Sequence, residues 1–211
     1  MNIKEAIEVT GGLSSPSKMP GLSYNLPAQE CKVGSRLRQV KNSTCSTCYA
    51  FKGRYRFTNV KNALYRRLDA VKDPRWIDSM SYLINRKSKD WFRWHDSGDL
   101  QSLIHLRDIV KVAENTPETW HWLPTREYSL VGNYLALGGE IPPNLTIRLS
   151  GHQINGNLGL GLGLPVSSVR TQDFKGYEDA YNCPAQNQGN VCGNCRACWN
   201  PEVKHVSYLK H

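Results

Sequence analysis

The sequence predicts an α/β protein in one domain, residues 1–211, whose parallel strands form a partial or compact βα barrel. Four short strand candidates alternate with helical patterns through the centre of the chain. The 211 residues, 39% of them hydrophobic, are enough for one substantial core. A full eightfold (TIM) barrel uses about 250 residues, so we expect an incomplete one. An open doubly wound sheet is the alternative.

Four amphipathic helices are expected. Asp73 and Pro74 separate the first two, because they are suited to an N-cap and a first helical turn. Asp99 begins the third helix, and Gly138 closes the fourth. Apolar residues at helical spacing assign these helices to residues 60–71, 76–84, 103–113 and 128–137.

The strand candidates are residues 91–95, 120–125, 145–150 and 165–170. Side chains alternate between the two faces of a strand, so each candidate has a polar and an apolar face. We expect the polar faces to line a basic interior. They carry Arg93, His95, His121, Thr125, Arg148, Ser150, Ser168 and Arg170. We expect the apolar faces to pack beneath the helices. They carry Phe92, Trp94, Trp120, Trp122, Ile147 and Leu149.

Seven cysteines gather near the two ends of the chain. The front thiol group, spaced C-x13-C-x2-C, is Cys31, Cys45 and Cys48. The tail thiol group, spaced C-x8-C-x2-C-x2-C, is Cys183, Cys192, Cys195 and Cys198. The sequence has no visible secretory signal and no run of membrane-spanning length, so we expect a cytoplasmic protein with reduced thiols. Clustered thiolates then predict a soft metal centre.

The spacing of the tail thiol group favours iron over zinc. Its overlapping C-x2-C-x2-C run resembles that of ferredoxins and suits three corners of a 4Fe-4S cluster, with Cys183 as the fourth ligand. Zinc, which more often uses two separate knuckles, is the alternative metal. One or two clusters are expected, and a single site that combines cysteines from both ends is also open.

The front thiol group offers three ligands, which leave one iron of a four-iron cluster without a protein ligand. Cys45-x2-Cys48 followed by Tyr49 resembles the second half of the radical S-adenosylmethionine (SAM) motif. That motif has three residues between its first and second cysteines, whereas thirteen residues separate Cys31 from Cys45 here. The resemblance implies a partial barrel and SAM as a cofactor.

A second resemblance covers nearly the whole chain. It rests on residues 10–14 (TGGLS), 18–21 (KMPG), 45–50 (CSTCYA), 93–99 (RWHDSGD) and 123–127 (LPTRE). Together these segments resemble the bacteriophage gene-product-eighty-eight family. The resemblance implies a phage origin, a location in the cytoplasm of the infected host and a metal cluster, and it implies no particular reaction.

Residues that follow the strands are the candidates for chemistry, because βα-barrel sites lie at the carboxyl ends of strands. Asp96 and Asp99 offer carboxylates for an amino group or a ribose, and Asp99 as a helix cap is the alternative. Arg126 suits a carboxylate or phosphate, unless it pairs with Glu127 or Asp96. Candidate catalytic residues are Asp96, Asp99 and Arg126. Candidate cofactor-binding residues are Ser97, Gly98, Arg93, His95 and Arg148.

The composition favours anionic partners. The formal net charge is +9, which suits an anionic small molecule, a nucleic acid or a negatively charged cluster, although the basic residues form no long run. Residues 155–163, which include alternating Gly and Leu, are expected as a flap or a surface connection. We therefore expect a phage iron–sulfur protein with redox or radical chemistry. The alternative is a non-catalytic iron–sulfur or zinc protein that recognises nucleic acid or a host protein.

Overall fold

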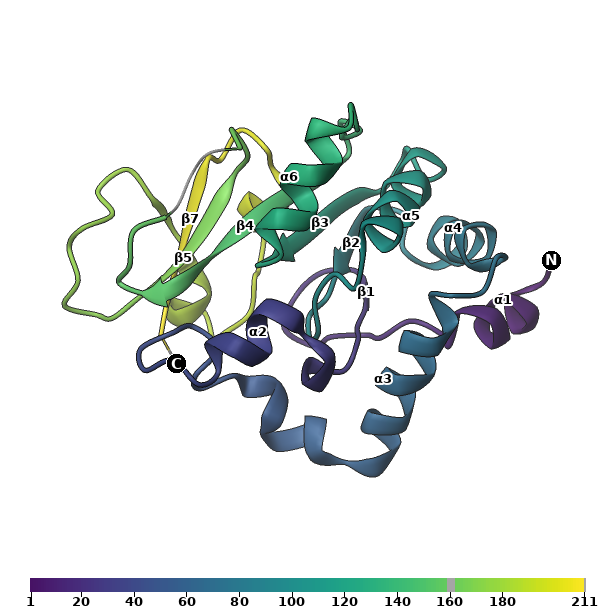
Figure 1. Cartoon of the computed structure of the whole chain (residues 1–211), viewed down its shortest axis with the longest axis horizontal. Coiled ribbons are helices and arrows are strands. Elements are labelled where there is room, and N and C mark those ends of the chain that lie inside the picture. The colour runs from purple at the N-terminus through teal and green to yellow at the C-terminus, as the bar shows by residue number, and fades with distance from the viewer. Residues whose placement is uncertain (159–161, 211) are drawn as a thin grey trace.

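The fold is built around one sheet of seven parallel strands (Figure 1). The computed structural model describes residues 1–158 and 162–210, so residues 159–161 of the expected flap lie outside the described residues. The strand order is β1-β2-β3-β4-β5-β7-β6. From β1 to β7 the bounds are Leu22–Tyr24, Trp91–Trp94, Trp120–Thr125, Leu145–Ile154, Val166–Arg170, Tyr181–Asn182 and His205–Leu209.

The expected α/β class with a parallel sheet is confirmed. All four strand candidates are present as β2, β3, β4 and β5, whereas β1, β6 and β7 were not expected. Within the described residues no pairing joins β1 to β6, so the sheet is open between its two edge strands. Parallel neighbours bring all the carboxyl ends of the strands to one edge, where loops from distant parts of the chain meet.

Six α-helices accompany the sheet in the described residues. Their bounds, from α1 to α6, are Ile3–Thr10, Lys32–Leu37, Thr58–Ala70, Trp76–Lys87, Leu103–Glu114 and Tyr128–Ala136. The four expected helices are α3 to α6. Ser102 caps α5, because its Oγ accepts the His105 N–H at 3.0 Å, so the assignment of this cap to Asp99 is wrong. No helix in the described part of the chain has the length and apolar character needed to cross a membrane.

One face of the sheet packs against α4, α5 and α6 and forms the main core. Phe92, Trp94, Ile147 and Leu149 are buried there, as their alternation predicts. They contact apolar residues of the three helices, among them Met80, Leu106 and Val131. Burial of side chains of this size contributes about 1.5–3 kcal/mol each, so this helix-side core supplies much of the stability.

The side chains of β3 point to the opposite faces from those expected. His121 lies on the helix side, where its ring stacks on Trp94 with centroids 6.0 Å apart. Trp122 lies on the opposite face in register with Arg93, and Trp120 is 43% exposed rather than packed beneath helices. The reason is that His121 is neutral in the core and donates or accepts a hydrogen bond with Thr116 at 2.8 Å, which satisfies one ring nitrogen there.

The opposite face, here called the inner face, carries Arg93, Trp122, Arg148 and Tyr208, as the strand register shows. The inward direction expected for Arg93 and Arg148 is therefore confirmed. Ser168 and Arg170 are paired in register with Ser207 and Leu209, which places them on the helix side with Val166, so their expected inward direction is wrong.

Candidate functional site

The front thiol group lies in the long connection between β1 and β2. Cys31 precedes α2, and Cys45 and Cys48 lie in the turns that follow it. Gly34 of α2 sits between them, because a Cβ at this position would lie 3.6 Å from Cys31 Sγ and 3.7 Å from Cys45 Sγ. Burial raises the pKa of Cys31, and the neighbouring Asp99, Cys45 and Cys48 raise it further. Because the Cys48 N–H also donates to the Cys45 carbonyl at 3.2 Å, the three front cysteines lie in neighbouring turns of the chain.

Hydrogen bonds tie this connection to the carboxyl ends of β3 and β4. Thr44 donates its N–H to the carbonyl of His152 at 2.9 Å and its hydroxyl to the carbonyl of Gly151 at 2.9 Å. Glu127 accepts the N–H of Val33, in the first turn of α2, at 2.8 Å. The front thiols are thus held at the edge where sites of parallel sheets form. No pattern in the sequence predicts these contacts of Thr44 and Glu127.

Asp99 is a buried acceptor at the same edge. Its carboxylate accepts the Thr125 hydroxyl at 2.6 Å and the backbone N–H groups of Leu100 and Arg126 at 2.8 and 2.9 Å. Burial raises its pKa to about 6, although hydrogen bonds from Thr125, Arg126 and Leu100 oppose the shift. These contacts join the β2–α5 loop to the end of β3, so Asp99 fixes the position of Arg126.

Arg126 is the cation whose charge lowers the pKa of both Cys31 and Cys45. Its Nε donates to the Thr44 hydroxyl at 3.0 Å. Burial raises the pKa of Cys45, and the charge of Arg126 is the largest influence that lowers it. In the described part of the chain its guanidinium makes no ion pair, neither with Glu127 nor with Asp96. The Nη atoms of Arg126 therefore remain available for an anionic ligand.

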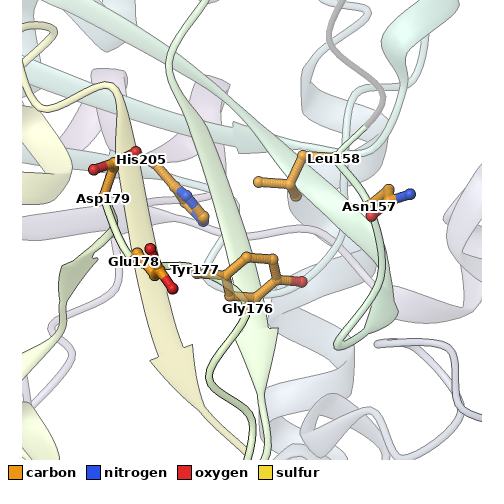
Figure 2. A pocket seen from close by; sticks show the side chains of 7 residues that line it. All are labelled: Asn157, Leu158, Gly176, Tyr177, Glu178, Asp179 and His205. Carbon is orange, nitrogen blue, oxygen red and sulfur yellow. The ribbon is translucent and has the colours of Figure 1, made fainter.

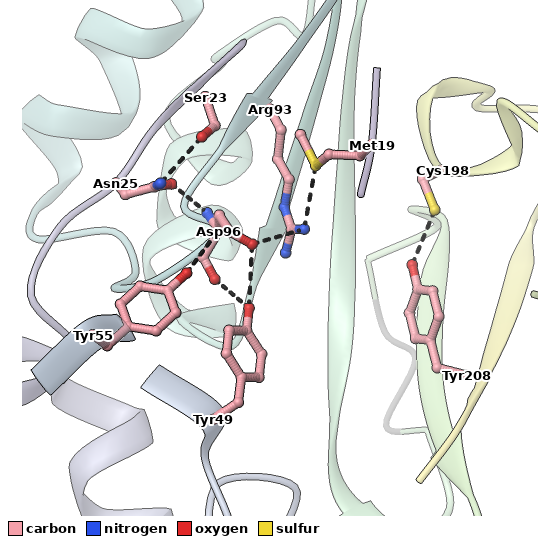
Figure 3. A network of polar contacts seen from close by, with 9 residues as sticks. All are labelled: Met19, Ser23, Asn25, Tyr49, Tyr55, Arg93, Asp96, Cys198 and Tyr208. Atoms are coloured by element: carbon pink, nitrogen blue, oxygen red, sulfur yellow. Dashed lines mark hydrogen bonds and ion pairs between the residues drawn. The ribbon is translucent and has the colours of Figure 1, made fainter. Parts of the chain in front are cut away.

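Asp96 lies at the centre of a second polar network (Figure 3). Its carboxylate accepts the Tyr55 hydroxyl at 2.6 Å and pairs with Arg93 Nη1 at 3.1 Å. Tyr49, directly after the last front cysteine, donates its hydroxyl to the Asp96 carbonyl. The Asp96 N–H donates to Asn25 Oδ1 at 2.7 Å, which fixes the end of β2 against the chain that follows β1.

Arg93 lies between the front and tail parts of the molecule. Besides Asp96, its guanidinium contacts Met19 Sδ at 3.6 Å and lies 4.4 Å from the centroid of the Trp122 ring. Its positive charge also lowers the pKa of Cys198, a smaller effect than burial, which raises it to about 12. In Figure 3 Arg93 stands between Asp96 and the Tyr208–Cys198 pair.

The tail thiol group forms on and beside the inner face. Cys183 follows β6 and donates its N–H to the Ser207 carbonyl of β7 at 2.9 Å. The Cys195 N–H donates to the Cys192 carbonyl at 3.0 Å, which places these two cysteines in one turn. Burial raises the pKa of Cys192, and Cys183 and Cys195 raise it further. Two tyrosines hold the other thiols. Tyr181 Oη lies 3.3 Å from Cys195 Sγ, and Tyr208 Oη lies 3.1 Å from Cys198 Sγ.

Arg148 fastens the tail to the sheet. Fully buried, it donates four hydrogen bonds of 2.9–3.1 Å to the backbone carbonyls of Val166, Ala197, Asn200 and Val203. Both Nη atoms are used in this way. The residue expected to bind a cofactor therefore binds the backbone on either side of Cys198.

Three buried N–H groups of the inner face have no hydrogen-bond partner among the described residues. They are Arg93 Nε, Trp122 Nε1 and Arg148 Nε. An unpaired buried donor costs about 1–3 kcal/mol, so an acceptor bound at this face would remove a real penalty. Two of the three belong to cations, which favours a negatively charged acceptor.

The remaining candidates contact residues other than the cysteines. His95, with a left-handed φ of 55°, turns to the helix side, where its ring centroid is 5.3 Å from that of His105. Ser97 donates its hydroxyl to the Leu26 carbonyl at 2.9 Å, and Gly98, with φ 81°, packs against Leu26. These residues shape the loop after β2.

A cavity of about 350 Å³ lies elsewhere, between the β4–β5 connection and the chain leading to β6 (Figure 2). It is lined by Asn157, Leu158, Gly176, Tyr177, Glu178, Asp179 and His205. No candidate residue from the sequence lines it. All seven cysteines are free thiols, and within the described residues no three metal-ligating side chains close around a single ion position.

Comparison with known proteins identifies the family. No curated protein and no solved structure matches the chain. The family model described as Gene product 88 matches residues 2–201, which includes both thiol groups and every motif that carries the resemblance. The chain therefore belongs to the gene product 88 family.

Proposed function

We propose that the protein is an iron–sulfur protein with two clusters and a radical-SAM-like front site. The observation that carries the proposal is the division of the thiols into two neighbourhoods. Three lie at the carboxyl edge of a parallel sheet, and four lie on or beside its inner face. The open sheet, with α4 to α6 on one face and the tail on the other, is consistent with a partial barrel.

The tail residues fit an anionic metal–thiolate group. Four thiolates carry several negative charges, and Arg93 and Arg148 supply nearby positive charge. The three unpaired N–H groups of the inner face supply donors, and hydrogen bonds to cluster sulfurs are among the factors that set reduction potentials. Iron is favoured over zinc by the overlapping C-x2-C-x2-C spacing. A role in structure or electron transfer follows for the tail.

The front residues fit a cluster with one open iron. When bound, such a cluster supplies an electron and an open coordination position for SAM. Arg126, whose Nη atoms make no ion pair in the described structure, would bind the SAM carboxylate or a phosphate of the substrate. Asp99 would act through its backbone contact with Arg126, and Asp96 would orient Tyr49 beside Cys48.

Metal analysis after anaerobic purification tests the proposal. Two cubanes require about eight irons and eight sulfides per chain and no stoichiometric zinc. Replacing Cys31, Cys45 and Cys48 by Ser should remove about half of the iron, and replacing Cys192, Cys195 and Cys198 by Ser should remove the other half. One cubane's worth of iron, or zinc alone, would contradict the two-cluster assignment.

A SAM assay tests the front site separately. Reduced protein incubated with SAM should release 5′-deoxyadenosine, and Arg126→Gln should raise the SAM concentration needed without lowering the iron content. The alternative function, a non-catalytic iron–sulfur or zinc protein that binds nucleic acid or a host protein, is supported by the basic charge. Loaded protein that releases no 5′-deoxyadenosine would favour this alternative.

A further inference from the structure

The positive charge of the protein is concentrated around the front thiol group. Residues 31–68, here called the basic segment, contain ten of the 27 Lys and Arg residues and none of the 18 Asp and Glu residues. The rest of the chain therefore has 17 basic residues against 18 acidic ones and is nearly neutral. The whole net charge of +9 thus comes from less than a fifth of the sequence.

These cations face solvent and are not neutralised. Nine of the ten are exposed, and only Arg67 is buried. The exposed cations are Lys32, Arg36, Arg38, Lys41, Lys52, Arg54, Arg56, Lys61 and Arg66. None of them takes part in an ion pair in the described structure, although five ion pairs occur elsewhere in it. A merely solvated helix face usually mixes both signs of charge, which this segment does not.

The basic segment forms one side of the molecule. It runs through α2, the turns that hold the front thiols, two short 3-10 helices (Tyr49–Phe51 and Gly53–Arg56) and into α3. In Figure 1 it is the blue chain along the lower border, from α2 to α3. The second 3-10 helix packs on both the first and α3, so these cations share a continuous surface.

Exposed aromatic rings are interleaved with the cations. Tyr49 is 53% exposed and Phe57 is 59% exposed, unusual values for side chains of this size. The two rings flank Arg54 and Arg56 in sequence, and the neighbouring Tyr55 ring lies 5.9 Å from Tyr49. Cations beside exposed aromatic rings are the combination that binds a phosphate backbone and stacks on unpaired bases.

We propose that the basic segment binds a single-stranded nucleic acid and delivers it to the front thiol group. This assignment of a substrate class rests on the proposed function of that group. Tyr49 connects the two features, since its ring is exposed on the basic segment while its hydroxyl is bonded to Asp96. A base stacked on Tyr49 would lie beside Cys48, which directly precedes it in the chain.

The binding test uses fluorescein-labelled 20-nucleotide oligothymidylate and oligouridylate with the full chain, by fluorescence anisotropy between 50 and 300 mM salt. We expect the logarithm of the association constant to fall linearly with the logarithm of the salt concentration. Arg54→Gln/Arg56→Gln should weaken binding about tenfold and reduce the slope by about 1.4, since each phosphate contact on a single strand contributes about 0.7.

A second variant tests stacking without charge. Phe57 is the N-cap residue of α3, where serine is a preferred residue, so Phe57→Ser removes the ring and retains the helix. We expect about fivefold weaker binding with an unchanged salt slope. The matched control is Lys87→Gln/Lys89→Gln, which removes the same charge at the far end of α4 and should bind as the wild type does.

Three results would overturn the inference: no binding of either oligonucleotide, equal weakening by the control pair, or equal affinity for heparin. Iron and sulfide are measured on every sample, which keeps this inference distinct from the proposed function. Protein with its full iron content that binds no oligonucleotide refutes only the nucleic-acid inference. Protein that binds oligonucleotides through the basic segment but never holds iron refutes the proposed function instead.

Discussion

Arg93 and Asp96 form an ion pair, with Nη1 and Oδ1 3.1 Å apart, at the point where the front and tail parts of the site meet. Asp96 connects this pair to Tyr49, the residue that directly follows Cys48, and the charge of Arg93 lowers the pKa of Cys198. Because both side chains are largely shielded from water, the pair is a mechanical and electrostatic link between the two thiol groups.

Removing both members of this pair should destabilise the protein by less than the sum of the two single removals. Arg93→Gln leaves Asp96 shielded and unpaired, and we expect a loss of about 2–3 kcal/mol in the free energy of unfolding. Asp96→Asn should have a similar effect, and the double variant should recover about 1 kcal/mol or more of the summed loss. Urea denaturation of the four proteins measures this coupling. Strict additivity of the two losses would contradict the link.

Arg148 should be among the most sensitive positions of the sheet. Arg148→Met removes the donors of four backbone carbonyls, so we expect a loss of about 3–5 kcal/mol in the free energy of unfolding. Arg170→Met is the matched control, because Arg170 bonds only the exposed Asn182 side chain at 3.0 Å and should cost less than about 1 kcal/mol. Similar losses for the two variants would contradict the role of Arg148.

Acid should destabilise the helix-side core. Burial lowers the pKa of His105 to about 4 and that of His121 to about 3, and burial lowers the pKa of His95 too. The unfolded chain therefore binds protons below pH 6.5 that the folded chain does not, and stability falls as pH falls from 6.5 towards 4. We expect a loss of about 2 kcal/mol each from His105 and His121 between pH 7 and 5, and a further loss from His95.

Chemical unfolding at the two pH values measures this loss. The variant His105→Gln should lose about 2 kcal/mol less than the wild type between pH 7 and 5. Asp99, with a folded pKa of about 6, acts in the opposite direction, because protonation between pH 6 and 3.8 stabilises the folded form. Equal stability at pH 7 and pH 5 would contradict neutral buried histidines.

Gly98 should tolerate no side chain. Its φ is 81°, and an added Cβ would lie 2.7 Å from the Leu26 carbonyl oxygen, so Gly98→Ala combines backbone strain with a clash and should cost about 3 kcal/mol or more. Gly138→Ala is the control, since it has nearly the same φ of 78° with nothing near the added Cβ. It should cost about 1–2 kcal/mol. Thermal or urea unfolding measures the two losses of stability. If they are equal, the clash with Leu26 does not contribute to the loss at Gly98.

The sequence predicts much of the framework and less of the directions in which side chains point. Strands β2 to β5 and helices α3 to α6 lie where their periodicity places them, because all of them except β3 bury one clear apolar face. β3 carries aromatic or apolar residues on both faces, so its alternation alone does not reveal that His121 belongs to the core and Trp122 to the inner face. His95 has a left-handed backbone conformation, which turns its side chain to the helix side, and alternation alone does not predict such a turn.

The candidate site, like the fold, could be predicted from the sequence only in part. Cysteine spacing was enough to divide the thiols into two groups and to suggest their metal. The partners of Asp99, Arg126 and Arg148 come from residues tens of positions away, and no local pattern predicts such contacts. Tyr49 had a local signal, since it directly follows Cys48, and the concentration of positive charge in residues 31–68 was visible in the sequence as well.

The four carbonyls that receive Arg148 have a consequence for biosynthesis. Val166 is made 18 residues after Arg148, but Ala197, Asn200 and Val203 are made 49, 52 and 55 residues after it. Until they arrive, the nascent sheet holds a guanidinium that it cannot bury without penalty. Arg148 can therefore be buried with all its partners only after the stretch of chain that contains Cys198 has been made, which couples completion of the sheet to the assembly of the tail thiol group.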